Sequence, residues 1–526
     1  MDILVCKISH LSIGVEMKKQ VSINFIAQIT AFIINVGISF FLTPYIVEKV
    51  GIEANGFVNL ANNFIQYAQL LTIALNSMAG RFITIKFHQK DYKEARTYFS
   101  SIIIANVFLS ILLSIVFAFV IIFLNKILNI TPSLLSDIQL LWMFIFLNFI
   151  TSIFSSTYSV GNFIKNRLDL AALYNMEGYF LRVLVLLITY LILPSAVWYV
   201  GLSTFIMGLY VMIRNIAFQK KNVPELKYAK ENFNWNAIKL LLSSGIWNTI
   251  SKLSSILSSG LDLLITNLFV NPVAMGILSV SKTLPTVILS LFGTMASAFM
   301  PELTISYAKN EISQMKQQLI TSIKIFSFLS TILMAILFGF GREFYALWTP
   351  TQDSNLLYML TVVSCLGLAF CLPLEPLYNI FIVTDKVKKS SIVLIFTSIM
   401  TIISVFIGLH FASSEEMKLF IIAGMSTLIG TIRVLTFLPI YGAHCLGYKW
   451  NTFYPIIIKN VLSILILTAL AFLYKNMVVL NSWISLIIAV IILFVISILI
   501  NVIILLTKEE LKTIRLFFRR KLGELK

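Results

Sequence analysis

Charged side chains inside otherwise apolar stretches are the residues of this sequence that could do chemistry. Lys252, Asp262 and Lys282 are three of them. A charge at the centre of a membrane-spanning helix costs roughly 2.5–3.5 kcal/mol, so it needs a partner or a function. Asp262 and Lys282 each lie ten residues from Pro272, hence at similar depth on adjacent helices. They either form an ion pair or act separately, as an ion-coupling carboxylate and a ligand-binding cation. Lys252 has no ionic partner by this geometry, which favours it as the contact for an anionic ligand.

Other charges in apolar stretches allow two interpretations each. Glu375 stands between two prolines, where a broken helix could bind a coupling H⁺ or Na⁺, or it is the partner of Arg433. Arg81, near the end of a predicted helix, is an interfacial anchor or a further cationic contact for the ligand. Glu177 and Arg182 are five residues apart, which permits only a loose pair.

Uncharged polar side chains form stripes along several apolar stretches, and the pattern repeats after 220 residues. The first stripe spans about 60° of a helix at 100° per residue. It consists of Asn24, Gln28, Asn35 and Ser39, and its counterparts are Ser244, Asn248, Ser255 and Ser259. The second consists of Asn59, Asn62, Asn63, Gln66, Ser77 and Thr84, matched by Ser279, Lys282, Thr283, Thr286, Ser297 and Thr304. Gly56 likewise matches Gly276.

These stripes are explained either by hydrogen bonds across a dry helix bundle or by a hydrated interior. Hydrogen bonds across a dry bundle need only one or two polar residues per helix, whereas each stripe here has four or more. The pattern therefore favours an interior wet enough to contact a polar ligand. Its candidate contacts are Gln28, Asn35, Asn62, Gln66 and Asn248, together with Lys252, Lys282 and Arg81.

The composition requires a membrane around these residues. Hydrophobic residues make up 58% of the 526-residue chain and charged residues 12%, and the mean hydropathy is +0.92. Soluble domains carry roughly 25% charged residues, and disordered chains have few apolar ones, so both classes are excluded. The four cysteines and four histidines are scattered, so we expect no metal site, cofactor or catalytic group.

Fourteen apolar segments predict an all-α polytopic fold with about fourteen transmembrane helices. They are 21–47, 56–85, 99–124, 138–160, 169–193, 196–213, 238–270, 274–305, 319–341, 355–384, 391–411, 419–441, 454–474 and 483–506. The parallel repeat predicts two six-helix bundles plus two C-terminal helices. The predicted domains are an N-terminal segment 1–20, bundles 21–218 and 238–445 joined by the linker 219–237, helices 446–506, and a basic tail 507–526.

Lysine and arginine are distributed unevenly between the two sides of this topology. The side that holds both termini has 29 of the 40 basic residues and the opposite side has 5. Because cytoplasmic loops collect basic residues, both termini are predicted to be cytoplasmic. The net charge of +17 then has a topological origin, and no nucleic-acid partner is expected.

Three stretches make the chain resemble the polysaccharide-exporter branch of the multidrug/oligosaccharidyl-lipid/polysaccharide (MOP) superfamily, in particular its Wzx-type flippases. They are TPYIVEKVGIEANGFVNLANNF (43–64), KFHQKDYKEAR (86–96) and SYAKNEISQMKQQ (306–318). The resemblance implies a bacterial inner-membrane protein that moves an undecaprenyl-diphosphate-linked oligosaccharide, of capsule or O-antigen type, to the outer leaflet. It also implies alternating access, coupling to H⁺ or Na⁺, and contact with polysaccharide-assembly machinery.

Two rival functions remain. A multidrug/cation antiporter of the same superfamily would favour a carboxylate-rich interior, whereas Lys252 and Lys282 favour anions. A membrane-embedded polysaccharide polymerase would need a sizeable outer loop with catalytic residues. The longest predicted outer loop, 125–137, has two charged residues, so an enzyme is not expected.

Overall fold

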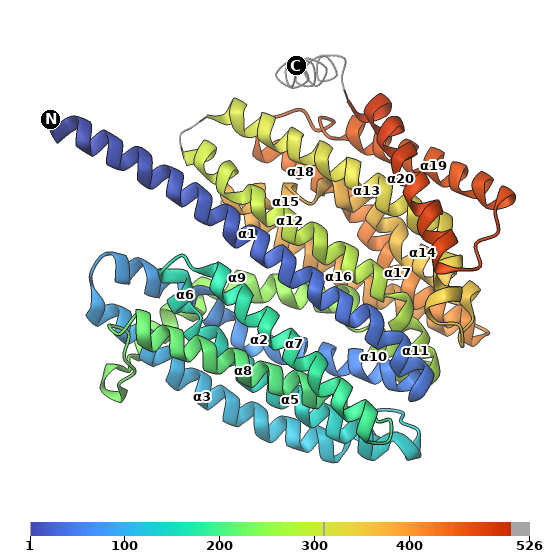
Figure 1. Cartoon of the computed structure of the whole chain (residues 1–526), viewed down its shortest axis with the longest axis horizontal. Coiled ribbons are helices and arrows are strands. Elements are labelled where there is room, and N and C mark those ends of the chain that lie inside the picture. The colour runs from blue at the N-terminus through green and yellow to red at the C-terminus, as the bar shows by residue number, and fades with distance from the viewer. Residues whose placement is uncertain (1, 309–310, 385, 507–526) are drawn as a thin grey trace. The chain divides into compact units, whose positions relative to one another are not determined.

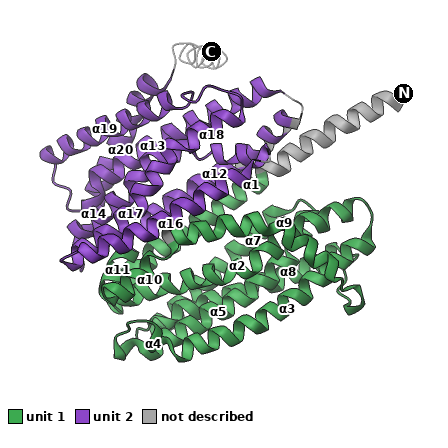
Figure 2. Cartoon of the chain, turned by 180° about the vertical axis from the view of Figure 1, so that it is seen from behind, with its two compact units in different colours: residues 1–279 green, residues 280–526 purple. Residues whose placement is uncertain are grey.

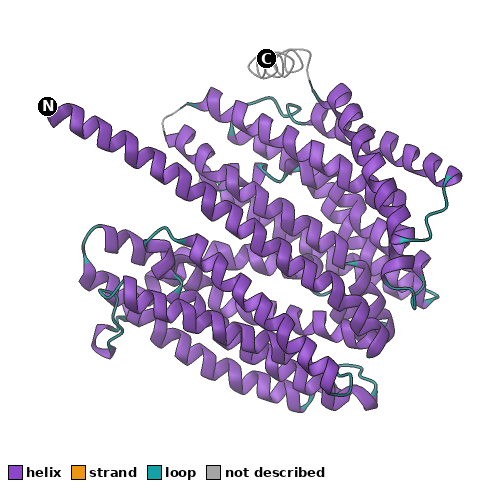
Figure 3. Cartoon of the chain, in the orientation of Figure 1, coloured by secondary structure: helices purple, strands orange, loops and turns teal. Residues whose placement is uncertain are grey.

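A computed structural model describes residues 2–308, 311–384 and 386–506. Within these ranges the regular elements are helices and no strand occurs, as Figure 3 shows. The predicted all-α fold is therefore confirmed. The predicted basic tail, 507–526, lies outside the described residues.

The first of two compact units comprises Met1–Ser279 (Figures 1 and 2). Its long helices are α1 (Asp2–Lys49), α2 (Ile52–His88), α3 (Tyr92–Ile122), α5 (Leu135–Tyr158), α7 (Leu168–Ile192), α8 (Trp198–Asn222) and α9 (Trp235–Ser255). Shorter elements are α4 (Leu124–Ile127), η1 (Pro132–Leu134), α6 (Val160–Ile164), η2 (Lys230–Asn232), η3 (Ile256–Gly260), α10 (Asp262–Phe269) and α11 (Pro272–Ser281).

The second unit comprises Val280–Lys526 (Figure 2). Its helices are α12 (Thr283–Ala308), α13 (Ile312–Trp348), α14 (Ser354–Cys371), η4 (Leu372–Leu374), α15 (Leu377–Val383), α16 (Val387–Phe411), α17 (Glu415–Thr436), α18 (Leu438–Cys445), α19 (Tyr454–Met477) and α20 (Trp483–Leu505). This division follows contacts within the chain, and the two six-helix bundles expected from the repeat stay a prediction.

Helices underlie all fourteen predicted segments. Among the described residues, eleven spans are long and apolar enough to cross a membrane, or twelve if α11 and α12, bent by 41°, form one span. The helices α2 and α9, which carry polar stripes, are not among these eleven. The chain is thus a multi-pass membrane protein, and the count of fourteen stays a prediction.

Two predicted spans are interrupted. The segment 238–270 is a straight α-helix only as far as Ser255, where the π-helix η3 begins, and a new helix begins at Asp262. The segment 355–384 breaks at η4, beside the prolines that predicted a kink. Interrupted helices are common in transporters because their freed backbone groups can line a polar interior.

The first unit is tied together by capping of its own helices. Asp137, in the first turn of α5, accepts hydrogen bonds from the backbone N–H groups of Val197 and Trp198, both at 2.9 Å. These bonds satisfy donors at the start of α8, which no intrahelical acceptor can reach. They also fix α8 against α5, with which it packs closely.

Candidate functional site

The polar face of α2 lies against the interruption between α9 and α10. Tyr67 donates its hydroxyl to the carbonyl oxygen of Gly260 at 2.6 Å, and Asn63 donates its amide to the same oxygen at 3.1 Å. Gly260 is the last residue of the π-helix η3. A backbone carbonyl at membrane depth needs donors, and here two side chains of α2 supply them.

Lys252 joins this network from α9. Its ammonium group donates to the Oε1 atom of Gln66 at 2.9 Å, and the Gln66 amide donates to the Oδ1 atom of Asn63 at 3.4 Å. Lys252 is half-buried. The sequence predicts no ionic partner for Lys252. The contact with Gln66 is not ionic, because the Gln66 side chain is a neutral amide. The structure thus brings together two of the predicted ligand contacts, Lys252 and Gln66.

Asn248, one turn before Lys252, faces the same helix. Its amide donates to the hydroxyl of Ser77 on α2 at 3.1 Å, and its side chain is exposed. Asn62 is also exposed, and its amide returns to the carbonyl of Val58 on its own helix at 2.9 Å. Asn62 is therefore not part of the network around Gly260.

Close backbone approach explains why α2 and α9 can share these contacts. A Cβ atom on Gly245 of α9 would lie 1.9 Å from the carbonyl oxygen of Ala74. Further along the chain, a Cβ on Gly276 would lie 2.3 Å from the carbonyl oxygen of Ile52. One on Gly56 would lie 3.0 Å from the Cα atom of Gly276. The two glycines matched by the repeat are thus in contact.

Further hydrogen bonds join α2, the turn after α4, α10 and α11 to one another. Asn59 donates to the hydroxyl of Ser279 at 2.5 Å. Asn129 and Asn267 exchange amide hydrogen bonds with each other at 2.8–2.9 Å. Glu53 accepts the backbone N–H of Thr131 at 3.0 Å and its hydroxyl at 2.7 Å.

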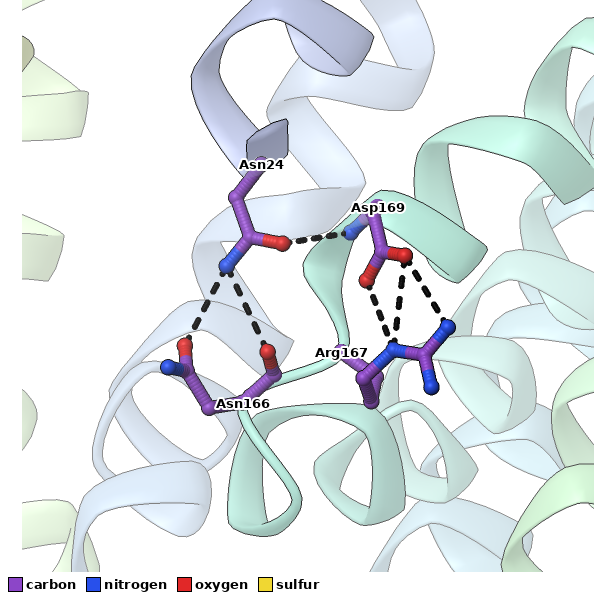
Figure 4. A network of polar contacts seen from close by, with 4 residues as sticks. All are labelled: Asn24, Asn166, Arg167 and Asp169. Atoms are coloured by element: carbon purple, nitrogen blue, oxygen red, sulfur yellow. Dashed lines mark hydrogen bonds and ion pairs between the residues drawn. The ribbon is translucent and has the colours of Figure 1, made fainter. Parts of the chain in front are cut away.

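The stripe of α1 begins with a structural residue. Asn24 donates to the backbone and side-chain oxygens of Asn166 at 3.4 and 3.2 Å, and it accepts the N–H of Asp169 at 2.9 Å (Figure 4). Asp169 also pairs with Arg167 at 3.0 Å. Asn24 therefore fastens α1 to the start of α7, as the dry-bundle interpretation expects.

Three further predicted contacts lie elsewhere in the first unit. Gln28 is exposed and Asn35 half-buried, both on α1. Arg81 is exposed on α2, two turns before its end at His88. Among the residues that the structure describes, none of these three side chains hydrogen-bonds to the network around Gly260.

Asp262 and Lys282 belong to different units. Asp262 is buried in the first turn of α10, and Lys282 is half-buried at the bend between α11 and α12. Each interacts with further groups. Whether they pair with each other stays a prediction.

Glu375 stands in the interruption between η4 and α15. The thiol of Cys371 donates to its Oε2 atom at 3.7 Å. Arg433 of α17 lies close enough to interact electrostatically with Glu375 and Tyr378. The two interpretations of Glu375, as a coupling carboxylate and as a partner of Arg433, thus refer to one cluster. Among the described residues, no group of three histidine, cysteine or acidic side chains could hold a metal ion.

The pairing of Asn129, in the turn after α4, with Asn267 of α10 was not expected from the sequence. Asn129 and Asn267 are ordinary polar residues 138 positions apart. The one sequence feature that could have indicated their pairing is that each lies beside a predicted extracytoplasmic turn. The π-helix η3 had one local signal, Gly260 within a run of serines.

Both the sequence and the fold have counterparts among known proteins. Residues 21–307 match the family model described as polysaccharide biosynthesis protein. A membrane protein of Bacillus subtilis (strain 168), EpsK, described as uncharacterized, is 26% identical over 468 residues, which are 89% of this chain and 92% of EpsK.

Two solved structures share the fold. A multidrug resistance MATE family transporter of the MOP superfamily, in an inward-facing conformation, superimposes with a TM-score of 0.64 at 14% identity, over 80% of this chain and 98% of its own. The lipid II flippase MurJ, in an inward closed conformation, superimposes with a TM-score of 0.60 at 14% identity, over 91% of this chain and 98% of its own.

Proposed function

Because the chain belongs to the polysaccharide biosynthesis protein family, we propose that it is a flippase for a lipid-linked oligosaccharide. Family and fold together are those of a lipid-linked flippase or another MOP transporter. The proposed substrate is an undecaprenyl-diphosphate-linked repeat unit of capsule or O-antigen type. Its head group would move from the cytoplasmic to the outer leaflet of the cytoplasmic membrane by alternating access, with both termini of the protein in the cytoplasm.

The observation that carries this proposal is the contact between Lys252 and Gln66. A diphosphate cannot enter hydrocarbon unless protein groups replace its hydration. A cation already held by a carboxylate would be a poor contact, since breaking a buried ion pair costs 3–5 kcal/mol. Lys252 is held by a neutral amide, at 2.9 Å. A phosphate oxygen can replace that amide at a net cost of about 1 kcal/mol for the lost hydrogen bond.

The remaining polar contacts suit sugars. An amide side chain both donates and accepts hydrogen bonds, as a sugar hydroxyl does. The side chains of Gln28, Asn35, Asn62, Gln66 and Asn248 are exposed or half-buried. Arg81 and Lys282 would supplement Lys252 along the path of the phosphates. Contacts that are individually weak favour release on the far side of the membrane.

Ion coupling would use the carboxylates Asp262 and Glu375. Each lies at an interrupted helix, where transporters bind coupling ions such as H⁺ or Na⁺. One elementary charge crossing 100 mV supplies about 2.3 kcal/mol, enough to bias an exchange between inward and outward states. The polysaccharide-assembly machinery is the proposed downstream partner.

A multidrug antiporter is the second candidate, and the MATE superposition favours it. The fold of MurJ, however, extends over 91% of this chain and that of the MATE transporter over 80%. The difference is close to the length of the segment that contains α19 and α20. The longer architecture and the cation Lys252 support the flippase.

The test is deletion of the gene followed by analysis of the lipid pool. Accumulated lipid-linked oligosaccharide on the cytoplasmic side supports the flippase, while an unchanged pool together with drug sensitivity supports the antiporter. Complementation with Lys252→Gln should restore export at about a tenth of the wild-type rate or less, because a charge-assisted hydrogen bond is lost.

Lys475→Gln is the matched control for Lys252→Gln. Lys475 pairs with Glu343 at 2.8 Å and contacts the carbonyl of Gly339 at 3.2 Å, in the second unit. Its loss should lower stability and leave export per folded molecule unchanged. Full export by a folded, inserted Lys252→Gln variant would exclude Lys252 as the phosphate contact.

A further inference from the structure

Arg182 is an intramembrane cation that the proposed function does not use. It lies 14 residues after the start of the 25-residue helix α7, about 21 Å along its axis and so near its middle. The lipid-facing side of α7 carries the exposed residues Phe180, Leu184, Leu187, Ile188 and Leu191. At 100° per residue, Arg182 points to the opposite side, together with the buried Gly178, Leu186 and Thr189. The arginine therefore faces the interior of the first unit.

Within the described part of the chain, one donor of the Arg182 guanidinium group is left unsatisfied. Its Nε atom is buried and has no hydrogen-bond acceptor. The neighbouring carboxylate of Glu177 is engaged elsewhere, because it pairs with Arg214 of α8 at 3.2 Å and accepts the hydroxyl of Tyr210 at 2.7 Å. Tyr179, one turn before Arg182, interacts with it electrostatically. A buried N–H donor without an acceptor costs about 1–3 kcal/mol, so it needs another explanation.

The register of α7 against α1 shows what lies beside Arg182. Asn24 accepts a hydrogen bond from the backbone N–H of Asp169, and the ring centroids of Tyr45 and Tyr190 are 4.7 Å apart. Both pairs are 145 residues apart, so the two helices run parallel and in register. By this register Arg182 lies at a level between Asn35 and Ser39. Asn35 shares the helix face that Asn24 turns toward α7, and it is half-buried.

We propose that Arg182 binds an oxyanion of the phosphate class inside the first unit. The guanidinium group presents a planar fork of N–H donors that matches two oxygens of a phosphate. The residue as a whole is only half-buried, so part of its side chain is open to a ligand. Asn35 supplies an amide at the same level for the ester or sugar side of the ligand. The identity of the natural ligand as the lipid-linked diphosphate rests on the proposed function.

Replacement of Arg182 should change the unfolding temperature in an unusual direction. A residue that only maintains the fold lowers the melting temperature when it is replaced. An unsatisfied buried cation does the opposite, because its neutral replacement removes the desolvation penalty. Arg182→Gln should therefore unfold at a higher temperature than the wild type while it loses the anion.

The experiment measures thermal unfolding of the purified full chain in detergent, with inorganic diphosphate as the probe and chloride at matched ionic strength as the reference. Diphosphate should raise the unfolding temperature of the wild type, since a ligand that binds the native state stabilises it. Arg182→Gln should weaken the apparent affinity by about tenfold or more, because charge-assisted hydrogen bonds are lost. Arg182→Lys, which keeps the charge without the fork, should fall between the two.

Arg167→Gln is the matched control. It removes an arginine of the same unit that pairs with Asp169 at 3.0 Å, and it leaves Glu177 engaged by Arg214, so its unfolding temperature should not rise and its response to diphosphate should persist. An equal diphosphate response in the wild type and Arg182→Gln, or no response beyond that to chloride in the wild type, overturns the proposal. If diphosphate binding depends on Arg182 while gene deletion leaves the lipid pool unchanged, the anion site stands and the flippase proposal falls.

Discussion

The carbonyl of Gly260 offers a quantitative test of the interruption between α9 and α10. Two α2 side chains donate to it, Tyr67 at 2.6 Å and Asn63 at 3.1 Å. Tyr67→Phe removes one donor and leaves the other, so unfolding should become easier by about 0.5–1.5 kcal/mol, the net value of one hydrogen bond. Asn63→Leu should cost a similar amount. The double variant removes both side-chain donors, and the desolvated carbonyl then adds about 1–3 kcal/mol.

The assay is a double-mutant cycle on reversible unfolding of the purified protein in mixed micelles. The expected double-variant loss exceeds the sum of the single losses by at least 1 kcal/mol, in the range of about 0.5–3 kcal/mol found for coupled neighbours. Single losses that simply add would refute the reasoning, because they would mean that the carbonyl does not depend on this pair of donors. Tyr67→Phe retains the ring, so a packing defect cannot produce the coupling.

Three further predictions concern packing, coupling and capping. Gly245→Ala should destabilise the protein by about 1–3 kcal/mol through overpacking, since its Cβ would lie 1.9 Å from a backbone oxygen of α2. Gly37→Ala is the control, because its Cβ would meet no atom within 4 Å. In the same unfolding assay it should be neutral or stabilise the protein by about 0.4–1 kcal/mol. The Glu375→Gln variant should retain downhill substrate exchange and lose its response to an imposed H⁺ or Na⁺ gradient in vesicles. An intact response would mean that Glu375 does not bind the coupling ion and serves only as the partner of Arg433. Asn267→Leu should cost about 1–3 kcal/mol, because it removes two hydrogen bonds between the Asn267 side chain and the backbone N–H and carbonyl of Asn129, each worth about 0.5–1.5 kcal/mol. An unchanged unfolding midpoint would contradict this.

The sequence predicted the fold class and the family well, for identifiable reasons. Hydropathy sets the spans, since twenty apolar residues cover the hydrocarbon whatever their partners. The break at Pro194 between α7 and α8 and the kink near Glu375 were readable because proline acts locally. The resemblance to a polysaccharide-exporter family is confirmed by the family match, and the two superpositions show the fold that the resemblance implied.

Pairings between distant residues could not be predicted in the same way. The stripe pattern identified Gln66 and Lys252 separately, but no local signal says that they meet at 2.9 Å. The side chains of α2 that donate to the π-helix η3 lie nearly 200 residues away from it in the chain. Glu177 pairs with Arg214, and the Nε atom of Arg182 has no acceptor, which the five-residue spacing of Glu177 and Arg182 does not reveal.

The central claim is that water reaches the middle of the membrane along the polar stripes. Its most direct measurement is labelling by a membrane-impermeant thiol reagent, in a variant without native cysteines, of single cysteines at positions 28, 66, 248 and 286. Leu191→Cys, at an 81% exposed position on the lipid-facing side of α7, is the control that should stay unlabelled. The account predicts that the four stripe positions react from at least one side of the membrane. Stripe cysteines as unreactive as that at position 191 would contradict it.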